Sequence, residues 1–271
     1  MYLLFDIGAS KMRLAVSKDL KKIDKIEVFP TPQKFREAMA LFHSMANGLS
    51  EGKRFTAAAG GIAGPLDHKQ TTVLAGHLKD WKDKPLKKSL ETSLHCPVYL
   101  ENDAALAGLG EAVAGAGKGK KVVAYLTFST GIGGAKIVDR KIDENAFGFE
   151  PHRQLVGYPK AKMLGELISG RALAKAGHAP AKDIADKATW KKFSDLAFAG
   201  INNAVVFWSP DIMVIGGGIG LSPHLDIKAV QAHINRTFSK LAATPRVVKA
   251  KLKDYSGLYG AMEILKLKIK H

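Results

Sequence analysis

The chain opens with Leu3-Leu4-Phe5-Asp6-Ile7-Gly8-Ala9-Ser10-Lys11, an apolar run that ends at an acidic residue and a glycine turn. Residues 12–16 then alternate in a way that is typical of a strand returning beside the first one. The stretch therefore predicts a strand, a tight turn and a second strand, with the Asp6 carboxylate beside the turn.

The same arrangement recurs in the middle of the chain. Residues 122–128 form an apolar run, residues 129–134 read Ser-Thr-Gly-Ile-Gly-Gly, and residues 135–138 are apolar again. A third apolar run ends in Gly216, Gly217 and Gly218. Glycines and hydroxyl residues allow backbone N–H groups to approach phosphate oxygens closely. Two such hairpins facing each other would hold a polyphosphate.

Each glycine turn is weak evidence by itself, because a glycine hairpin is more often plain turn geometry than a nucleotide site. The chain has neither a Walker A loop nor a Rossmann fingerprint, since the glycines at 131–134 lead into a strand and not into a helix. The order of the turns along the chain is the stronger signal.

A candidate catalytic group lies at Glu101-Asn102-Asp103, between the apolar run 97–100 and the small-residue helical stretch 104–112. Ligands of open α/β sheets bind beyond the carboxyl ends of the strands, so Asp103 is a candidate general base. A helix N-terminus would favour its ionised form. The alternative is that Asn102 or Asp103 only caps the following helix.

The ordered motifs resemble those of the ROK family, which contains glucokinases, other hexose and N-acetylhexosamine kinases, and sugar-responsive repressors. The resemblance covers nearly the whole chain and rests on residues 6–11, 61–67, 81–86, 101–103, 130–134, 169–173, 214–218 and 257–261. It implies an α/β, two-domain, actin-like (ribonuclease H-like) ATPase fold with a cleft between the domains, and a homodimer.

The resemblance also implies roles for single residues. Asp103 would be the base that takes a proton from the sugar hydroxyl, and Asp6 would organise Mg²⁺, through water. The other sugar-binding positions would be Gly64, Asn102, Glu150, His152, Arg153 and Glu166. The positions that bind ATP would be Asp6, Gly8, Ala9, Ser10, Lys11, Thr130, Gly131, Gly217 and Gly218.

The chain departs from the family pattern at several positions. Residues 149–153 read Phe-Glu-Pro-His-Arg, so Arg153 stands where the family has histidine and His152 lies one residue early. Ala9 and Ser129 replace glycines of the phosphate turns. For Glu166, the alternative to sugar binding is a solvated position on a helix face. The single cysteine, Cys96, reads as a core residue and excludes the family's structural zinc.

The net charge of +16 leaves a second class of function open. Lysine clusters at 18–25, 79–88, 118–121 and 266–270 could bind nucleic acid by counterion release. They are scattered and lack interleaved aromatic residues, so we favour a solvated surface whose positive field attracts ATP. The absence of a basic, apolar leader and of long apolar stretches predicts a cytoplasmic protein without a membrane partner.

The expected organisation is a small first domain, residues 1–103, and a larger second domain, residues 104–255, with a last helix at about 256–270 returning to the first. The apolar content of 46% is sufficient for two cores. Further helices are expected at 33–47, 85–94, 161–176 and 190–207.

Overall fold

The protein, described here by a computed structural model, divides into two compact units. The first contains Met1–Gly110, Ala146–Gly148 and Tyr255–His271, and the second contains Glu111–Asn145 and Phe149–Asp254. The division falls inside a helix, seven residues after the boundary expected at Asp103. The residues described are 1–74, 78–146, 148–157, 159–177, 183–240 and 243–269.

The first unit is built on a five-stranded sheet with the order β3-β2-β1-β4-β5. The first three strands form an antiparallel meander, and β4 and β5 run parallel to β1 on its other side. The strands are β1 (Tyr2–Ile7), β2 (Lys11–Ser17), β3 (Lys25–Pro30), β4 (Ala57–Ile62) and β5 (Val98–Asn102).

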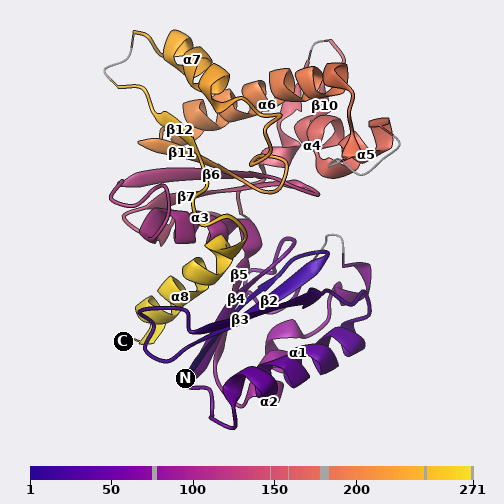
Figure 1. The fold of residues 1–271 in the computed structure, drawn as a ribbon, viewed down its shortest axis with the longest axis vertical. Helices are drawn as coiled ribbons and strands as arrows, with labels where there is room; N and C mark the ends of the chain where they lie inside the picture. Colours follow the sequence, from indigo (N-terminus) through magenta and orange to yellow (C-terminus); the bar gives the residue numbers. More distant parts are fainter. Residues whose placement is uncertain (75–77, 147, 158, 178–182, 241–242, 270–271) are drawn as a thin grey trace. The chain divides into compact units, whose positions relative to one another are not determined.

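Two helices, α1 (Phe35–Ser50) and α2 (Leu86–Leu94), cover one face of this sheet (Figure 1). Each helix places its buried residues three or four positions apart, as an amphipathic helix does. These residues are Ala38, Phe42, Ala46 and Leu49 of α1 and Leu86, Leu90 and Leu94 of α2. They pack on Leu3, Phe5 and Ile7, the residues of β1 that point to this face. A short 3-10 turn, η1 (Lys79–Trp81), adds the fully buried Trp81 to the same core.

The helix α8 (Ser256–Ile269) packs against β1 and β4, and it crosses α3 (Asp103–Val113) at very short distance. A Cβ on Gly110 would lie 2.0 Å from the Ser256 carbonyl oxygen, and a Cβ on Gly260 would lie 2.0 Å from the Leu106 carbonyl oxygen. The crossing therefore requires glycine on both helices, because the neighbouring atoms belong to the backbone. Among the described residues, no helix is long and apolar enough to span a membrane.

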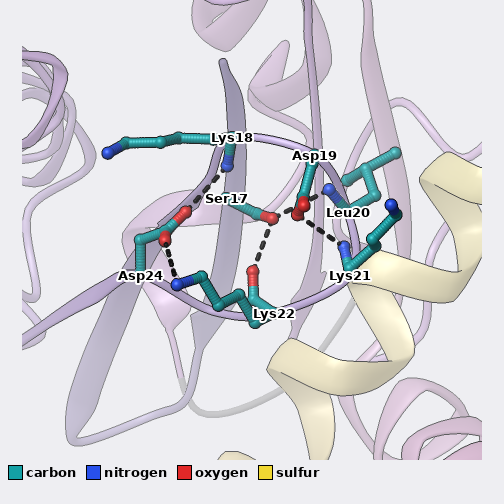
Figure 2. A network of polar contacts seen from close by, with 7 residues as sticks. All are labelled: Ser17, Lys18, Asp19, Leu20, Lys21, Lys22 and Asp24. Atoms are coloured by element: carbon teal, nitrogen blue, oxygen red, sulfur yellow. Dashed lines mark hydrogen bonds and ion pairs between the residues drawn. The ribbon is translucent and has the colours of Figure 1, made fainter.

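The connection between β2 and β3 is held by its own polar contacts (Figure 2). The Ser17 hydroxyl donates to the Lys22 carbonyl (2.6 Å) and accepts from the Leu20 N–H (3.0 Å). The Lys18 N–H donates to the Asp24 carboxylate (2.9 Å). The lysine ammonium groups of this hairpin lie at the surface, as expected for a solvated basic segment.

The second unit repeats the topology of the first. Its sheet has the order β12-β11-β6-β7-β8, again an antiparallel meander with two parallel strands on the far side of its first strand. The strands are β6 (Val122–Phe128), β7 (Ile132–Val138), β8 (Lys141–Ile142), β11 (Ile212–Gly216) and β12 (Arg246–Lys249). The strand–turn–strand pattern that occurs twice in the sequence therefore reflects two sheets of the same topology.

Two long helices of this unit begin at acidic caps. Asp186 accepts from the N–H groups of Ala188 and Thr189 at the start of α6 (Lys187–Trp208), and Asp226 caps α7 (Ile227–Thr237) in the same way. A two-stranded ribbon, β9 (Leu155–Val156) with β10 (Lys162–Met163), leads into α4 (Leu164–Ile168) and α5 (Gly170–Gly177).

The expectation of one helix over residues 161–176 is wrong. Residues 162–163 form a strand, and the helix is interrupted at Ser169, which has extended backbone angles. The interruption allows the N–H of Gly170 to donate to the Ser129 carbonyl (2.8 Å). Tertiary hydrogen bonding thus prevails over the local helical pattern.

Candidate functional site

In the triplet Glu101-Asn102-Asp103, Asn102 has a structural role at the start of α3 and Asp103 carries the candidate catalytic carboxyl. The Asn102 side-chain oxygen accepts from the N–H groups of Ala104 (3.0 Å) and Ala105 (3.2 Å), so Asn102 caps α3. Asp103 Oδ1 also contacts the Ala104 N–H (2.8 Å), and Oδ2 accepts no hydrogen bond from any described residue. Because Asn102 supplies the cap, the Asp103 carboxylate retains an oxygen that can accept a proton.

A second loop, residues 64–72, is fastened to the same strand end. The Asn102 amide donates to the Gly64 carbonyl (3.2 Å), and Gly64 has a φ of +116° that favours glycine. The Gln70 amide donates to Glu101 Oε2 (2.8 Å). Burial raises the pKa of Glu101, although the Asn102 N–H and the Gln70 amide oppose the change. These bonds fix the residues that precede Asp103.

The Asp103 carboxyl lies near that of Asp6, which is on the α8 face of β1. Burial, and then the negative charge of Asp6, raise the pKa of Asp103 to about 7. The Ala104 N–H at the helix N-terminus favours the ionised form, as expected, but burial and the Asp6 charge outweigh it. Asp6 pairs with Arg13 on β2, with 3.5 Å between Asp6 Oδ2 and the guanidinium. The result is a carboxyl poised near neutral pH.

In the first glycine turn, residues 8–10, the carbonyl groups accept hydrogen bonds from Thr31 and Gln33. The Thr31 hydroxyl donates to the Gly8 carbonyl (2.7 Å), and the Thr31 N–H donates to the Ser10 carbonyl (3.1 Å). The Gln33 amide donates to the Ala9 carbonyl (3.4 Å). The N–H groups of Ala9 and Ser10 have no acceptor among the described residues. Oriented N–H groups of this kind suit an anion.

In the second turn, residues 129–131, the carbonyl groups also accept hydrogen bonds, here from backbone N–H groups. The N–H groups of Gly170 and Arg171, at the start of α5, donate to the carbonyls of Ser129 (2.8 Å) and Thr130 (3.3 Å). A Cβ on Gly170 would lie 2.6 Å from the Ser129 oxygen. Neither Ala9 nor Ser129 has a positive φ, so the glycines they replace are not required by the backbone.

The third turn packs on the end of β6, close to the second. Gly217 has a φ of +80°, and a Cβ there would lie 2.4 Å from the Phe128 carbonyl oxygen. The N–H groups of Ile219 and Gly220 donate to the same carbonyl (3.0 and 3.1 Å). Gly218 has open space where its side chain would be. Gly217 and Gly218 thus lie next to the strand that leads into Thr130 and Gly131.

Two further candidates, His152 and Arg153, lie in the 3-10 turn η2 (Pro151–Arg153) of the second unit, and a third, Glu150, directly precedes it. His152 Nδ1 lies 2.9 Å and Arg153 Nε 3.6 Å from the same oxygen of Glu150. Arg153 is largely exposed. Glu166 is exposed as well and accepts from the Met163 N–H (3.2 Å) at the start of α4, while Gly165 beside it packs on His152.

Sequence reasoning missed several residues that shape the site. Thr31, Gln33 and Gln70 are remote in sequence from the groups they hold, so no motif spacing reveals them. Lys11 begins β2 with an exposed side chain. His77 and Lys270 lie outside the described residues. In the part of the chain that is described, no group of three or more His, Cys, Asp or Glu residues could hold a metal.

The chain is similar over most of its length to known sugar kinases. The glucokinase of Streptomyces coelicolor is 24% identical over 96% of this chain and 95% of its own length. The N-acetyl-D-glucosamine kinase of Escherichia coli O127:H6 is also 24% identical, over 96% of this chain and 98% of its own. A ROK family glucokinase from Streptomyces griseus, solved with glucose and AMPPNP, is 26% identical with a TM-score of 0.75, covering 98% of this chain and 99% of that chain.

These structural likenesses confirm the expected actin-like α/β fold, in which each unit carries a five-stranded sheet of the same order. The sequence model of the ROK family matches residues 2–268. Because that match spans nearly the entire chain, the protein belongs to the ROK family.

Proposed function

We propose that this protein transfers the γ-phosphoryl group of ATP to a hexose, most specifically to the primary 6-hydroxyl of glucose. The observation that carries the proposal is the Asp103 carboxyl, with a pKa of about 7 and one oxygen without a partner among the described residues. The S. coelicolor and S. griseus glucokinases support the choice of sugar and of nucleotide.

In the proposed reaction the Asp103 carboxylate accepts the proton of the sugar hydroxyl. The sugar oxygen forms a bond to the γ-phosphorus, the bond from that phosphorus to the bridging oxygen breaks, and ADP leaves. Phosphoryl transfer has a loose transition state, so positioning and charge neutralisation carry most of the catalysis. Backbone N–H groups of the turns at 8–10 and 129–131 are the proposed phosphate donors, and Gly217 and Gly218 would lie on the adenosine side.

Asp6 fits the requirement for a divalent cation. Mg²⁺ prefers oxygen ligands and retains several of its waters, and the Asp6 carboxylate lies in the field of a second carboxyl, that of Asp103. Asp6 would hold the ion through water, and the ion would neutralise charge on the phosphates. The Arg13 guanidinium orients Asp6 from β2.

Asn102, Gly64, Glu150, His152, Arg153 and Glu166 are the proposed sugar-binding residues. A second substrate class is an N-acetylhexosamine, because the N-acetyl-D-glucosamine kinase is as similar to this chain as the S. coelicolor glucokinase is. Arg153, whose side chain is 66% exposed, stands at the position of the family's sugar-binding histidine, so its substitution should affect the choice of sugar most directly.

The test is ADP release from ATP and Mg²⁺ across a panel of hexoses and N-acetylhexosamines. Turnover that is fastest with glucose would support the proposal, and a higher kcat/KM for an N-acetylated sugar would move the assignment to the second class. A folded protein without turnover on any sugar, combined with sugar or nucleic-acid binding, would instead indicate a regulator.

The pH dependence follows from the raised pKa of Asp103. Only the ionised carboxylate accepts a proton, so kcat/KM should rise with pH through about 7 and fall about tenfold per unit below it. The measurement is kcat/KM for the best sugar from pH 5 to 9 at saturating ATP. A profile that stays flat down to pH 5 would contradict the role of Asp103.

Replacing Thr31 by Val should loosen the first phosphate turn. The substitution keeps the shape of a buried side chain but removes the donor to the Gly8 carbonyl, which costs about 1 kcal/mol of stability. We expect the KM for ATP to rise about tenfold while the KM for the sugar changes less than twofold. Thr189→Val, which removes a hydroxyl bonded to Asp186 at the start of α6, is the control and should leave both KM values unchanged.

We also propose that the protein forms a homodimer. Phe207 and Val206, at the end of α6, are 79% and 50% exposed, which is unusual for such apolar side chains. Light scattering should give twice the chain mass, and Phe207→Glu should shift the equilibrium to the monomer if this surface is the interface.

A further inference from the structure

A cavity of about 730 Å³ lies in the first unit, and none of the candidate site residues lines it. Its walls come from the last turns of α1, from the connection that follows α1, and from the end of α2. Polar side chains of the lining include His43, Asn47, Lys53, Arg54, Ser93 and His95. Phe55 and Leu94 form an apolar floor. Its size is that of a small-molecule site.

The cavity lies at the opposite end of the sheet from Asp103. The connections at 51–56 and 95–97 enter β4 and β5 at their amino ends, whereas Asp103 follows the carboxyl end of β5. A six-residue strand such as β4 spans about 20 Å. A ligand in this cavity would therefore not contact the proposed catalytic residues of the unit.

The charge of the lining is positive. Lys53 and Arg54 are exposed to the cavity, neither makes an ion pair with a described residue, and no carboxylate lines the walls. The helix ends of α1 and α2 each contribute about half a negative charge, or about one in total. The two side-chain cations outweigh these partial negative charges, so the lining itself is positive.

A relay of hydrogen bonds leaves a hydroxyl donor available at the rim. The Asn47 amide donates to His43 Nε2 (2.9 Å), which places the ring proton on Nδ1. His43 Nδ1 then donates to Ser93 Oγ (2.7 Å), so the Ser93 hydroxyl hydrogen is free to point to a ligand. Ser50, in contrast, already donates to the Asn47 carbonyl (2.9 Å).

We propose that this cavity binds a small phosphate monoester, such as a sugar phosphate. A guanidinium, an ammonium and a hydroxyl are donors, and a phosphate group offers enough acceptor oxygens to use all three. The volume exceeds that of a phosphate ion, and the floor of Phe55 and Leu94 suits the less polar face of an attached sugar. The site is separate from the proposed kinase reaction and stands or falls independently of it.

The experiment is a titration of the full-length protein, followed by NMR on the imidazole signals of His43 and His95 and on the backbone amide of Ser93. The probes are inorganic phosphate, glucose 6-phosphate and citrate, each at constant ionic strength. These signals report on the cavity itself, so binding of phosphate at the glycine turns does not obscure the result. We expect saturable shifts with both phosphates and tighter binding of the sugar phosphate.

Two variants of equal charge separate a site from a general electrostatic effect. The double variant Lys53→Ala/Arg54→Ala should weaken phosphate binding at least tenfold. Lys18→Ala/Lys21→Ala removes the same charge from the β2–β3 hairpin of the same unit, where these ammonium groups make no contact with the residues drawn in Figure 2, and should change binding less than twofold. Ser93→Ala, which leaves the charge intact, should weaken it threefold or more.

The proposal is overturned if neither phosphate gives a saturable shift at these signals, or if both double variants weaken binding equally. Citrate binding as tightly as glucose 6-phosphate would also overturn it, because the cavity would then accept any anion. All of these side chains except the floor residues and Ser50 are at or near the surface, so the variants should fold.

Discussion

Asp103→Asn should lower kcat at least about 100-fold with the preferred sugar, because the amide cannot accept a proton from the hydroxyl while general-base catalysis contributes factors of 10² to 10⁴. The KM values should change little, since an amide retains the size and the hydrogen-bonding reach of the carboxylate. Single-turnover measurements with saturating ATP would show whether the phosphoryl-transfer step itself is slowed.

The stability of the same variant provides an independent check. A carboxyl whose pKa is raised in the folded state contributes stability that is present in full below its ordinary value of 3.8, and this contribution is lost as the pH rises toward about 7. At pH 8 the neutral Asp103→Asn variant should therefore withstand more urea than the native protein. Asp19→Asn, in the exposed β2–β3 hairpin, should leave activity unchanged and should not increase the resistance to urea, because the Lys21 N–H lowers the pKa of Asp19 in the folded protein. An Asp103→Asn protein with native turnover would refute the proposed mechanism.

Gly260→Ala should destabilise the protein by about 3 kcal/mol, the upper part of the range for overpacked cores. The new Cβ would lie 2.0 Å from the Leu106 carbonyl oxygen, and a backbone atom cannot move aside as a side chain does. The helices α3 and α8 must therefore separate. Because α3 begins at Asp103, we expect activity to fall as well, even at temperatures where the variant remains folded.

Gly48→Ala is the matched control for this substitution. Gly48 lies inside α1, and a Cβ there would have nothing within 4 Å. Alanine is favoured over glycine in a helix by about 1 kcal/mol, so this variant should be more stable than the native protein and equally active. Urea unfolding of both variants side by side measures the difference. Equal effects of the two substitutions would show that the α3–α8 contact is not as close as described.

The expected strands and helices with strong periodicity are present, with ends shifted by a few residues. The apolar runs at 3–7 and 122–128 became β1 and β6, and the helix expected at 85–94 is α2. β4 could not be predicted in this way, because its sequence Ala-Ala-Ala-Gly-Gly-Ile has neither alternation nor β-branched residues before its end. Its small residues make sense only with the tertiary contacts. Gly61, for example, lies beneath the Cα of Asp103.

Prediction of the candidate site from the sequence was limited in a similar way. The glycine turns and Asp103 are local signals, so the sequence exposes them directly. Which groups hold them in place depends on contacts between distant segments, such as Thr31 with Gly8 and Gly170 with Ser129. The competition between Asn102 and Asp103 for the helix cap could be framed from the sequence, but only the hydrogen bonds of α3 assign the cap to Asn102.

The return of α8 to the first unit has a consequence for synthesis on the ribosome. The face of the first sheet that contains Leu4 and Ala59, together with Leu106 and Leu109 of α3, is covered by the last helix of the chain. The second unit is contiguous in sequence apart from residues 146–148, and it emerges before that helix does. The first sheet therefore stays incompletely buried until α8 has been synthesised, and apolar surface exposed during that interval favours aggregation of the nascent protein.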